Sequence, residues 1–106
     1  MKDNQLLTLS SLLRKVIAES ARQVNTYGIQ DRPPVEWLAI IAEEFGELAK
    51  AINDYWFKQD SNPLAFVDEV VTEAIQTATL SLKIAEMFQK TIDEYKIHYP
   101  PEPGEK

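Results

Sequence analysis

The sequence predicts an all-α fold, a bundle of three main helices per chain that homo-oligomerisation completes. Apolar residues recur at helical spacing in three segments, and no alternation of apolar and polar residues typical of a strand competes with them. Proline-containing segments separate these stretches. A chain of 106 residues is one domain by length, and so small a domain buries only a modest share of its surface. We therefore expect a partner subunit to complete the core.

The first helix is predicted from about Leu6 to Val24, because leucine, valine and isoleucine recur there every three or four residues. The segment NTYGIQDRPP then ends it. Apolar spacing resumes after Pro34, which predicts a second helix from about Val35 to Lys58. The segment KQDSNP closes that helix.

The third helix is predicted to begin at Pro63, because the side chain of Asn62 can cap free amides and proline suits a first helical turn. It is expected to run to about Phe88 and on towards Tyr95. Its apolar residues cover a very wide arc, which indicates that one chain does not cover its own core.

The predicted domain covers residues 1–99, and PPEPGEK over residues 100–106 is predicted to be a flexible tail, since proline lacks the amide that a helix needs. The absence of cysteine excludes disulfides, thiolate nucleophiles and cysteine-ligated metal sites. A net charge of −6 without a basic cluster argues against a nucleic-acid partner. No apolar run approaches the ~20 residues that span a bilayer, and MKDNQ lacks a secretion-signal pattern, so a cytoplasmic protein without a membrane partner is expected.

The stretch IAEEFGELAK places three glutamates on a helix that is otherwise apolar. A helical wheel at ~100° per residue puts Glu44 inside the apolar arc and Glu47 at its edge, whereas Glu43 falls outside. Glu44 and Glu47 are three positions apart and therefore lie one above the other. An acid on the apolar side of a helix requires an explanation that a solvated acid does not.

On the third helix, Glu69, Glu73 and Gln76 group on one flank of the apolar arc. Like charges held close in a low-dielectric setting are costly unless they are compensated, and few lysines or arginines are near in sequence. A divalent cation would compensate them, and an all-oxygen ligand set prefers a hard ion such as Mg²⁺ or Mn²⁺. Structural ion pairs are the other setting in which such acids occur.

These residues resemble a known signature. EEFGE at Glu43–Glu47, followed by EAIQ at Glu73–Gln76, is similar to the Glu-Glu-x-x-Glu, spacer, Glu-x-x-Asp signature of the MazG-like nucleotide pyrophosphohydrolases. The wider pattern from about Glu19 to Phe88 resembles a branch in which the last acid is glutamine. The resemblance implies an all-α homodimer or homotetramer that uses magnesium to split nucleoside triphosphates, or their deoxy forms, into the monophosphate and pyrophosphate.

The resemblance also implies a set of metal ligands, namely Glu44, Glu47, Glu73 and Gln76. Gln76 stands where the family most often has aspartate, and an amide oxygen can coordinate magnesium but contributes no charge. Glu69, one turn before Glu73, could supply the missing charge. An alternative registration takes Glu69 as the first acid of the second motif and Thr72 as the last position.

The family chemistry needs a proton acceptor, for which Glu43 or Glu44 is the candidate; we favour Glu43, because Glu44 is expected to hold metal. Lys83 is a candidate phosphate contact, with a surface lysine as the other interpretation. Gln23 could read a base or ribose, or be a satisfied polar residue. Trp37 could stack on a base, although aromatic residues at helical spacing more often pack in a core or interface.

Two other classes of protein compete with this interpretation. Di-iron and di-manganese bundles also place acids inside helices, but they use Glu-x-x-His pairs, which this sequence lacks. The second class is a non-catalytic helical dimer that acts as a regulator, or as a nucleotide sensor that lost activity through Gln76. The sequence alone does not distinguish it from the enzyme.

Overall fold

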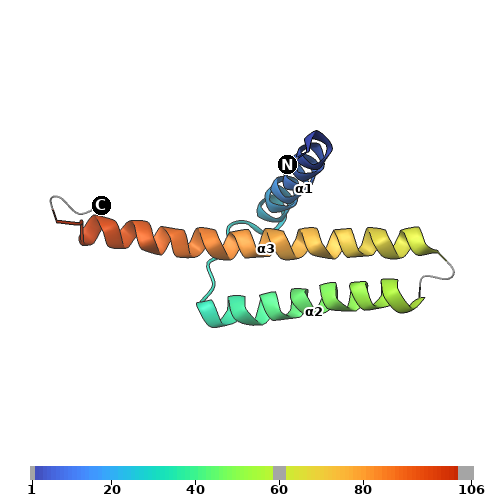
Figure 1. Cartoon of the computed structure of the whole chain (residues 1–106). Helices are drawn as coiled ribbons and strands as arrows, with labels where there is room; N and C mark the ends of the chain where they lie inside the picture. Colours follow the sequence, from blue (N-terminus) through green and yellow to red (C-terminus); the bar gives the residue numbers. More distant parts are fainter. Residues whose placement is uncertain (1, 59–61, 103–106) are drawn as a thin grey trace.

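The computed structural model describes residues 2–58 and 62–102. In this part of the chain there are three helices, α1 (Asp3–Tyr27), α2 (Pro34–Lys58) and α3 (Pro63–His98), and no strand (Figure 1). The all-α prediction is therefore confirmed. Each helix begins within three residues of its predicted start, and α1 and α3 run three residues beyond their predicted ends. Residues 103–106 of the predicted tail lie outside the described residues.

Local chemistry explains where the helices begin and end. The side chain of Asn62 accepts a hydrogen bond of 3.3 Å from the amide of Ala65, so the predicted cap of α3 is present. At the end of α1, the amide of Gly28 donates to the carbonyl of Val24 at 2.8 Å. Gly28 has φ of 74°, a conformation that glycine adopts without a steric penalty.

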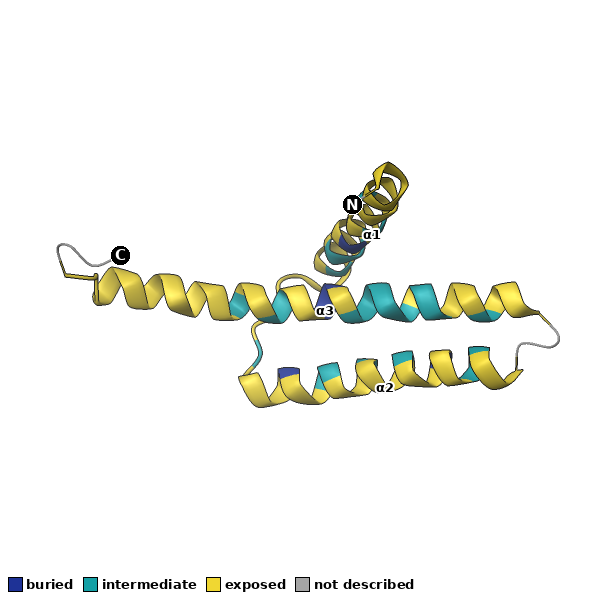
Figure 2. Ribbon diagram, viewed as in Figure 1, coloured by how far each residue is buried: buried dark blue, intermediate teal, exposed yellow. Residues whose placement is uncertain are grey.

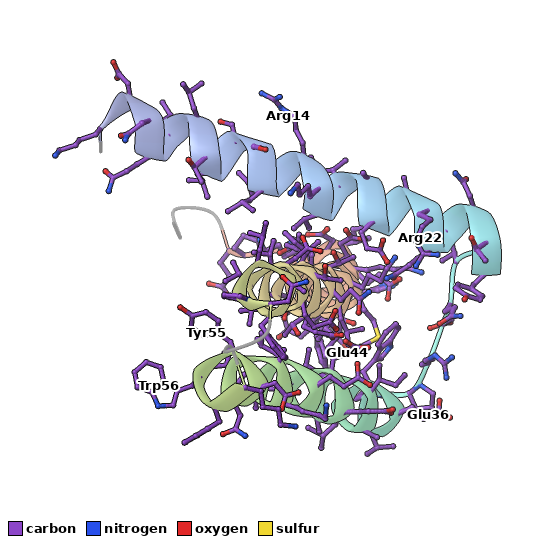
Figure 3. The ribbon with its side chains drawn as sticks, turned by 90° about the vertical axis from the view of Figure 1, so that its right-hand side faces the viewer. Arg14, Arg22, Glu36, Glu44, Tyr55 and Trp56 are labelled. Atoms are coloured by element: carbon purple, nitrogen blue, oxygen red, sulfur yellow. The ribbon has the colours of Figure 1, made fainter. Side chains whose placement is uncertain are left out.

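The long helix α3 runs through the middle of the molecule (Figures 1 and 3). It contacts α2, which lies antiparallel beside it, and α1, which crosses it steeply on another side. Within the described residues α1 and α2 do not contact one another. The molecule is consequently open, with a radius of gyration of 18.2 Å where a compact domain of this length has about 13 Å.

The core is small and follows the two contact lines of α3 (Figure 2). Its buried apolar members are Val16, Trp37, Ala51 and Leu80. Thr79 is completely buried, and its hydroxyl donates to the carbonyl of Ile75 at 2.7 Å, which satisfies that polar group inside the core. Large apolar side chains on all three helices stay exposed. None of the helices in the described segments has the length and hydropathy of a membrane span.

Candidate metal centre

The antiparallel pairing of α2 and α3 brings three glutamates together. Glu44 and Glu47 come from successive turns of α2, and Glu73 comes from α3. One carboxylate oxygen of each lies within 4.8 Å of the others. Glu44 and Glu73 are half-buried, whereas Glu47 is exposed and closes the group from the solvent side. We name these residues the glutamate triad.

The triad has acceptor capacity that the protein leaves unused. Oε2 of Glu44 and Oε2 of Glu73 are both buried and have no hydrogen-bond partner in the described part of the chain. Figure 3 shows Glu44 lying between α2 and α3. A buried acceptor without a partner is unfavourable, and native structures contain few of them. Two such oxygens lie in one group of acids, which makes the triad a candidate metal site.

The pKa values of Glu44 and Glu73 are both raised, as expected for acids whose buried oxygens lack a partner. Burial raises the pKa of Glu44, and the charges of Glu47 and Glu43 raise it further. Burial also raises the pKa of Glu73, with added contributions from the carboxyls of Glu69, Glu47 and Glu44. Both shifts have the direction expected for acids that lack a compensating cation.

The protein does not provide that compensation itself. In residues 2–58 and 62–102, the ion pairs within 4.0 Å join Arg22 to Glu19, and join Lys50 and Lys58 to Asp54. None involves the triad. Three carboxylates supply only part of the coordination of a hard divalent cation, and Mg²⁺ usually keeps such open positions for water and substrate phosphates. The donor set therefore fits Mg²⁺ or Mn²⁺, with positions left for a ligand.

A pocket of about 930 Å³ adjoins the triad. Glu44 and Gln76 line it from α2 and α3, and the end of α1 with the loop that follows forms the opposite wall. Although the chain is acidic as a whole, several cations line this pocket, namely Arg22, Arg32, Lys83 and Lys90. Four acids also line it, namely Glu19, Asp31, Glu44 and Glu86, so acidic and basic groups lie side by side in the pocket.

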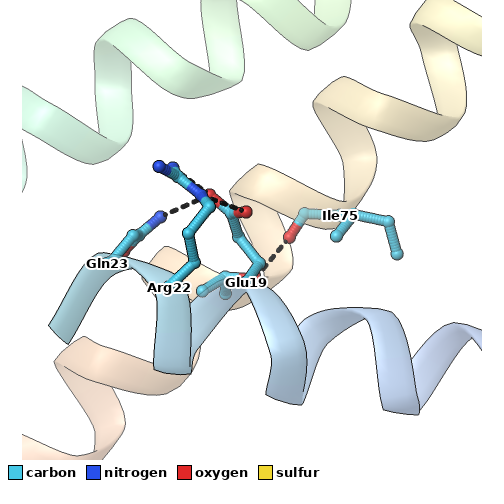
Figure 4. A network of polar contacts seen from close by, with 5 residues as sticks. Glu19, Arg22, Gln23 and Ile75 are labelled. Atoms are coloured by element: carbon cyan, nitrogen blue, oxygen red, sulfur yellow. Dashed lines mark hydrogen bonds and ion pairs between the residues drawn. The ribbon is translucent and has the colours of Figure 1, made fainter. Parts of the chain in front are cut away.

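The α1 wall of the pocket is organised by one carboxylate. Arg22 donates to Glu19 through Nη2 at 2.7 Å and Nε at 3.0 Å, and Gln23 donates to Glu19 at 3.0 Å (Figure 4). The hydrogen bond from Arg22 is the main reason that the pKa of Glu19 is lowered. Glu19 is therefore compensated within the protein, in contrast to Glu44.

The residues predicted to contact substrate all line this pocket, but in different states. Gln23 is engaged with Glu19. Lys83 is half-buried and has no carboxylate within 4.0 Å among the described residues. Trp37 is only 5% exposed, so its ring has no open face for stacking a base. Its indole N–H is buried and has no hydrogen-bond partner in residues 2–58 and 62–102. Trp37 is a core residue with one unpaired donor in the pocket wall.

The structure leaves two further predicted residues outside the triad. Glu43, predicted as the proton acceptor, is exposed on α2, although its charge contributes to the raised pKa of Glu44. Glu69 is exposed one turn before Glu73 and raises the pKa of that residue. Gln76 is half-buried and belongs to the pocket.

Sequence reasoning missed several pocket residues. Arg22 is exposed but pairs with Glu19, and the spacing of these two residues, three apart on a helix, is the signal that would have predicted their pairing. Arg32 lies in the connection between α1 and α2, and no periodicity predicts where a loop side chain lies. Tyr27 and Lys90 join the pocket only because α1 crosses α3 at this point.

No family model matches the chain, and no curated protein or solved structure matches it. The likeness to the MazG-like enzymes therefore depends on the motif residues themselves.

Proposed function

We propose that this protein is a magnesium-dependent nucleoside triphosphate pyrophosphohydrolase, which converts an NTP or dNTP and water to the monophosphate and diphosphate in nucleotide-pool housecleaning. The observation that supports it most is the triad: carboxylate oxygens of Glu44, Glu47 and Glu73 lie within 4.8 Å of one another, and Glu44 and Glu73 each bury an oxygen that has no hydrogen-bond partner among the described residues. The motif resemblance around the same residues supports the same chemistry.

In this mechanism the triad holds the metal, and the pocket holds the nucleotide. Magnesium would neutralise triphosphate oxygens and make hydroxide available near neutral pH. Glu43 would be the proton acceptor for the attacking water; its charge reaches the carboxyl of Glu44, but its side chain is exposed outside the triad, so it would have to turn towards the water to act.

The pocket suits a nucleotide in size and charge. Its volume of about 930 Å³ falls within the ~300–1,000 Å³ of ordinary small-molecule sites. Lys83 lies in the same pocket as Glu44 and forms no ion pair within 4.0 Å in the described residues, although its charge helps to lower the pKa of Glu19. We take it as the candidate cation for a phosphate. The exposed ring of Tyr27, at the α1 wall, is available to the base or ribose. The side-chain amide of Gln23 already donates to Glu19, so a contact between Gln23 and the nucleotide would compete with that hydrogen bond.

Gln76 supports one alternative. Because glutamine stands where the family most often has aspartate, a second metal position would lack a charge, and the protein could bind a nucleotide with magnesium without turning it over. Such a protein would be a nucleotide sensor or regulator on the same scaffold.

The experiment that tests the proposal measures pyrophosphate release with magnesium over a panel of ribo- and deoxynucleoside triphosphates. We expect turnover in the wild type and a loss of about 100-fold or more in Glu44→Gln and Glu73→Gln, because even the loss of a group that only supports a metal ligand costs about 10–100-fold in metal affinity or activity. Glu36→Gln is the matched control, because Glu36 lies on α2 outside both triad and pocket. Unchanged turnover in the triad variants would refute the site, and binding without turnover in the wild type would establish the sensor.

A further inference from the structure

One polar group in the pocket wall is buried and lacks a partner. Trp37 lines the pocket together with Ile40 and Glu44 of the same helix, and it is only 5% exposed. Its indole nitrogen Nε1 has no hydrogen-bond acceptor in residues 2–58 and 62–102. An indole N–H can only donate a hydrogen bond. Buried polar groups in native structures nearly always have a partner, so this donor calls for an acceptor from outside the chain.

Packing alone does not explain a tryptophan at this position. A phenylalanine would also bury an aromatic ring, and it would bring no polar group that needs a partner. The second tryptophan of the chain, Trp56, lies on the same helix but is 67% exposed, where water can solvate its N–H. Trp37 is thus the tryptophan whose N–H needs an explanation.

Trp37 lies two helical turns from the metal centre. It precedes Glu44 by seven residues, which is about 10 Å along α2 at ~1.5 Å per residue. Helix α3 runs antiparallel to α2, and Leu80 follows Glu73 by the same seven residues (Figure 1). Trp37 and Leu80 therefore lie at one level of the pocket. A nucleotide held by its phosphates at the triad would extend its sugar and base towards this level.

The lining of α2 and α3 changes in character along this direction. Glu44 and Gln76 line the pocket near the triad, and Ile40 and Leu80 give it an apolar stretch further on. The N–H of Trp37 is the polar group that follows. A nucleobase has apolar faces and a polar edge, so an apolar wall with one donor matches a base better than it matches a phosphate.

A buried donor selects for an acceptor on the edge of the base. Uracil carries a carbonyl oxygen where cytosine carries an amino group, and hypoxanthine differs from adenine in the same way. An amino group in that place would leave the indole N–H unpaired. The acids beyond the triad do not offer a buried acceptor for it, because Glu19 is engaged by Arg22 and Gln23, and Asp31 and Glu86 are exposed.

We infer that the indole N–H of Trp37 is a specificity-determining donor that binds a carbonyl oxygen of the base, so that the site favours oxo bases over their amino counterparts. The inference rests on the proposed function and adds the class of base to it. Nε1 is covered by neighbouring side chains in this structure, so the wall must open for a base to reach it. Met87 lines the same pocket, and its unbranched side chain can change rotamer without movement of a helix.

Titration calorimetry with magnesium and non-hydrolysable α,β-imido triphosphates tests the preference. We expect the wild type to bind the uridine analogue about tenfold more tightly than the cytidine analogue, and the inosine analogue about tenfold more tightly than the adenosine analogue. Trp37→Phe keeps an aromatic ring but lacks the donor, so it should bind both members of each pair equally. Trp56→Phe is the matched control and should keep the preference, because Trp56 is exposed and does not line the pocket.

The outcomes separate this inference from the proposed function. A wild type that binds and hydrolyses nucleotides without preferring the oxo bases would overturn the inference and leave the pyrophosphohydrolase standing. An equal loss of affinity for all four analogues in Trp37→Phe would overturn it too, since that is the effect of a purely structural residue. A wild type that binds none of the analogues and releases no pyrophosphate would overturn both.

Nuclear magnetic resonance tests the hydrogen bond in the wild type, without a change in the core. The chain has two tryptophans, so isotope-labelled protein gives two indole N–H signals, and Trp56→Phe identifies its own by removing it. When the wild type is saturated with magnesium and the uridine analogue, the indole proton of Trp37 is expected to move downfield and to exchange more slowly with water. The signal of Trp56 should stay in place. A Trp37 signal that does not move at saturation would refute the contact.

Discussion

Glu44 of α2 and Glu73 of α3 each bury one carboxylate oxygen that has no hydrogen-bond partner in the described part of the chain, and both carboxylates reach the same group with Glu47. Burial is the largest cause of the raised pKa of each. The packing of α2 against α3 at these two carboxylates therefore lowers the free energy of unfolding of the metal-free protein. Such local instability is common where a structure is arranged for a ligand rather than for its own stability.

Removing a triad charge should therefore stabilise the metal-free protein. We expect Glu44→Gln to raise the Tm by a few degrees in the presence of a chelator, on a scale where ~1 kcal/mol moves the Tm of a small domain by about 4–8 °C. Magnesium should raise the Tm of the wild type in a concentration-dependent way, because it binds the folded state, and should have little effect on Glu44→Gln. Thermal unfolding followed by circular dichroism, with and without MgCl₂, measures both, and Glu36→Gln should behave as the wild type. Equal magnesium dependence in the wild type and in Glu44→Gln would contradict the metal centre.

The cation of Lys83 should contribute to nucleotide affinity. We expect Lys83→Gln to weaken binding of a non-hydrolysable triphosphate analogue about tenfold in the presence of magnesium, the scale of one charge-assisted hydrogen bond. Lys96→Gln is the control, because Lys96 is exposed in the last turn of α3 and does not line the pocket. Titration calorimetry measures the affinity whether or not the protein turns the nucleotide over. A loss of the same size in both variants would show only the effect of net charge.

Asp54 should make stability depend on pH in acid. Hydrogen bonds from Lys50 and then Lys58 lower the pKa of Asp54 in the folded protein. A carboxylate whose pKa is lowered on folding stabilises the protein above its unfolded pKa of about 4, and this contribution is lost as the pH falls through the lower, folded value. We therefore expect Asp54→Asn to lower the Tm slightly at pH 7, with a difference that shrinks as the pH falls below about 4. Asp68→Asn, at an exposed position of α3 that forms no ion pair among the described residues, should show a smaller difference at pH 7. A Tm difference for Asp54→Asn that stays constant from pH 7 to pH 2 would contradict this assignment.

The sequence by itself determined the helices and the sides on which their residues lie. Apolar spacing predicted all three segments, and the wheel separated half-buried Glu44 from exposed Glu43. Both results depend on the period of an α-helix, which is a local property of the chain.

Only the tertiary structure decided which sides meet. The register of α2 against α3 sets Glu73 beside Glu44 and Glu47, and it is fixed by side-chain packing along the whole contact rather than by any local pattern. The crossing of α1 over α3 places Arg22 and Lys83 around one pocket, and the same packing buries the ring of Trp37. These distances arise between segments far apart in the chain, where the spacing of residues along one helix carries no information about its neighbour.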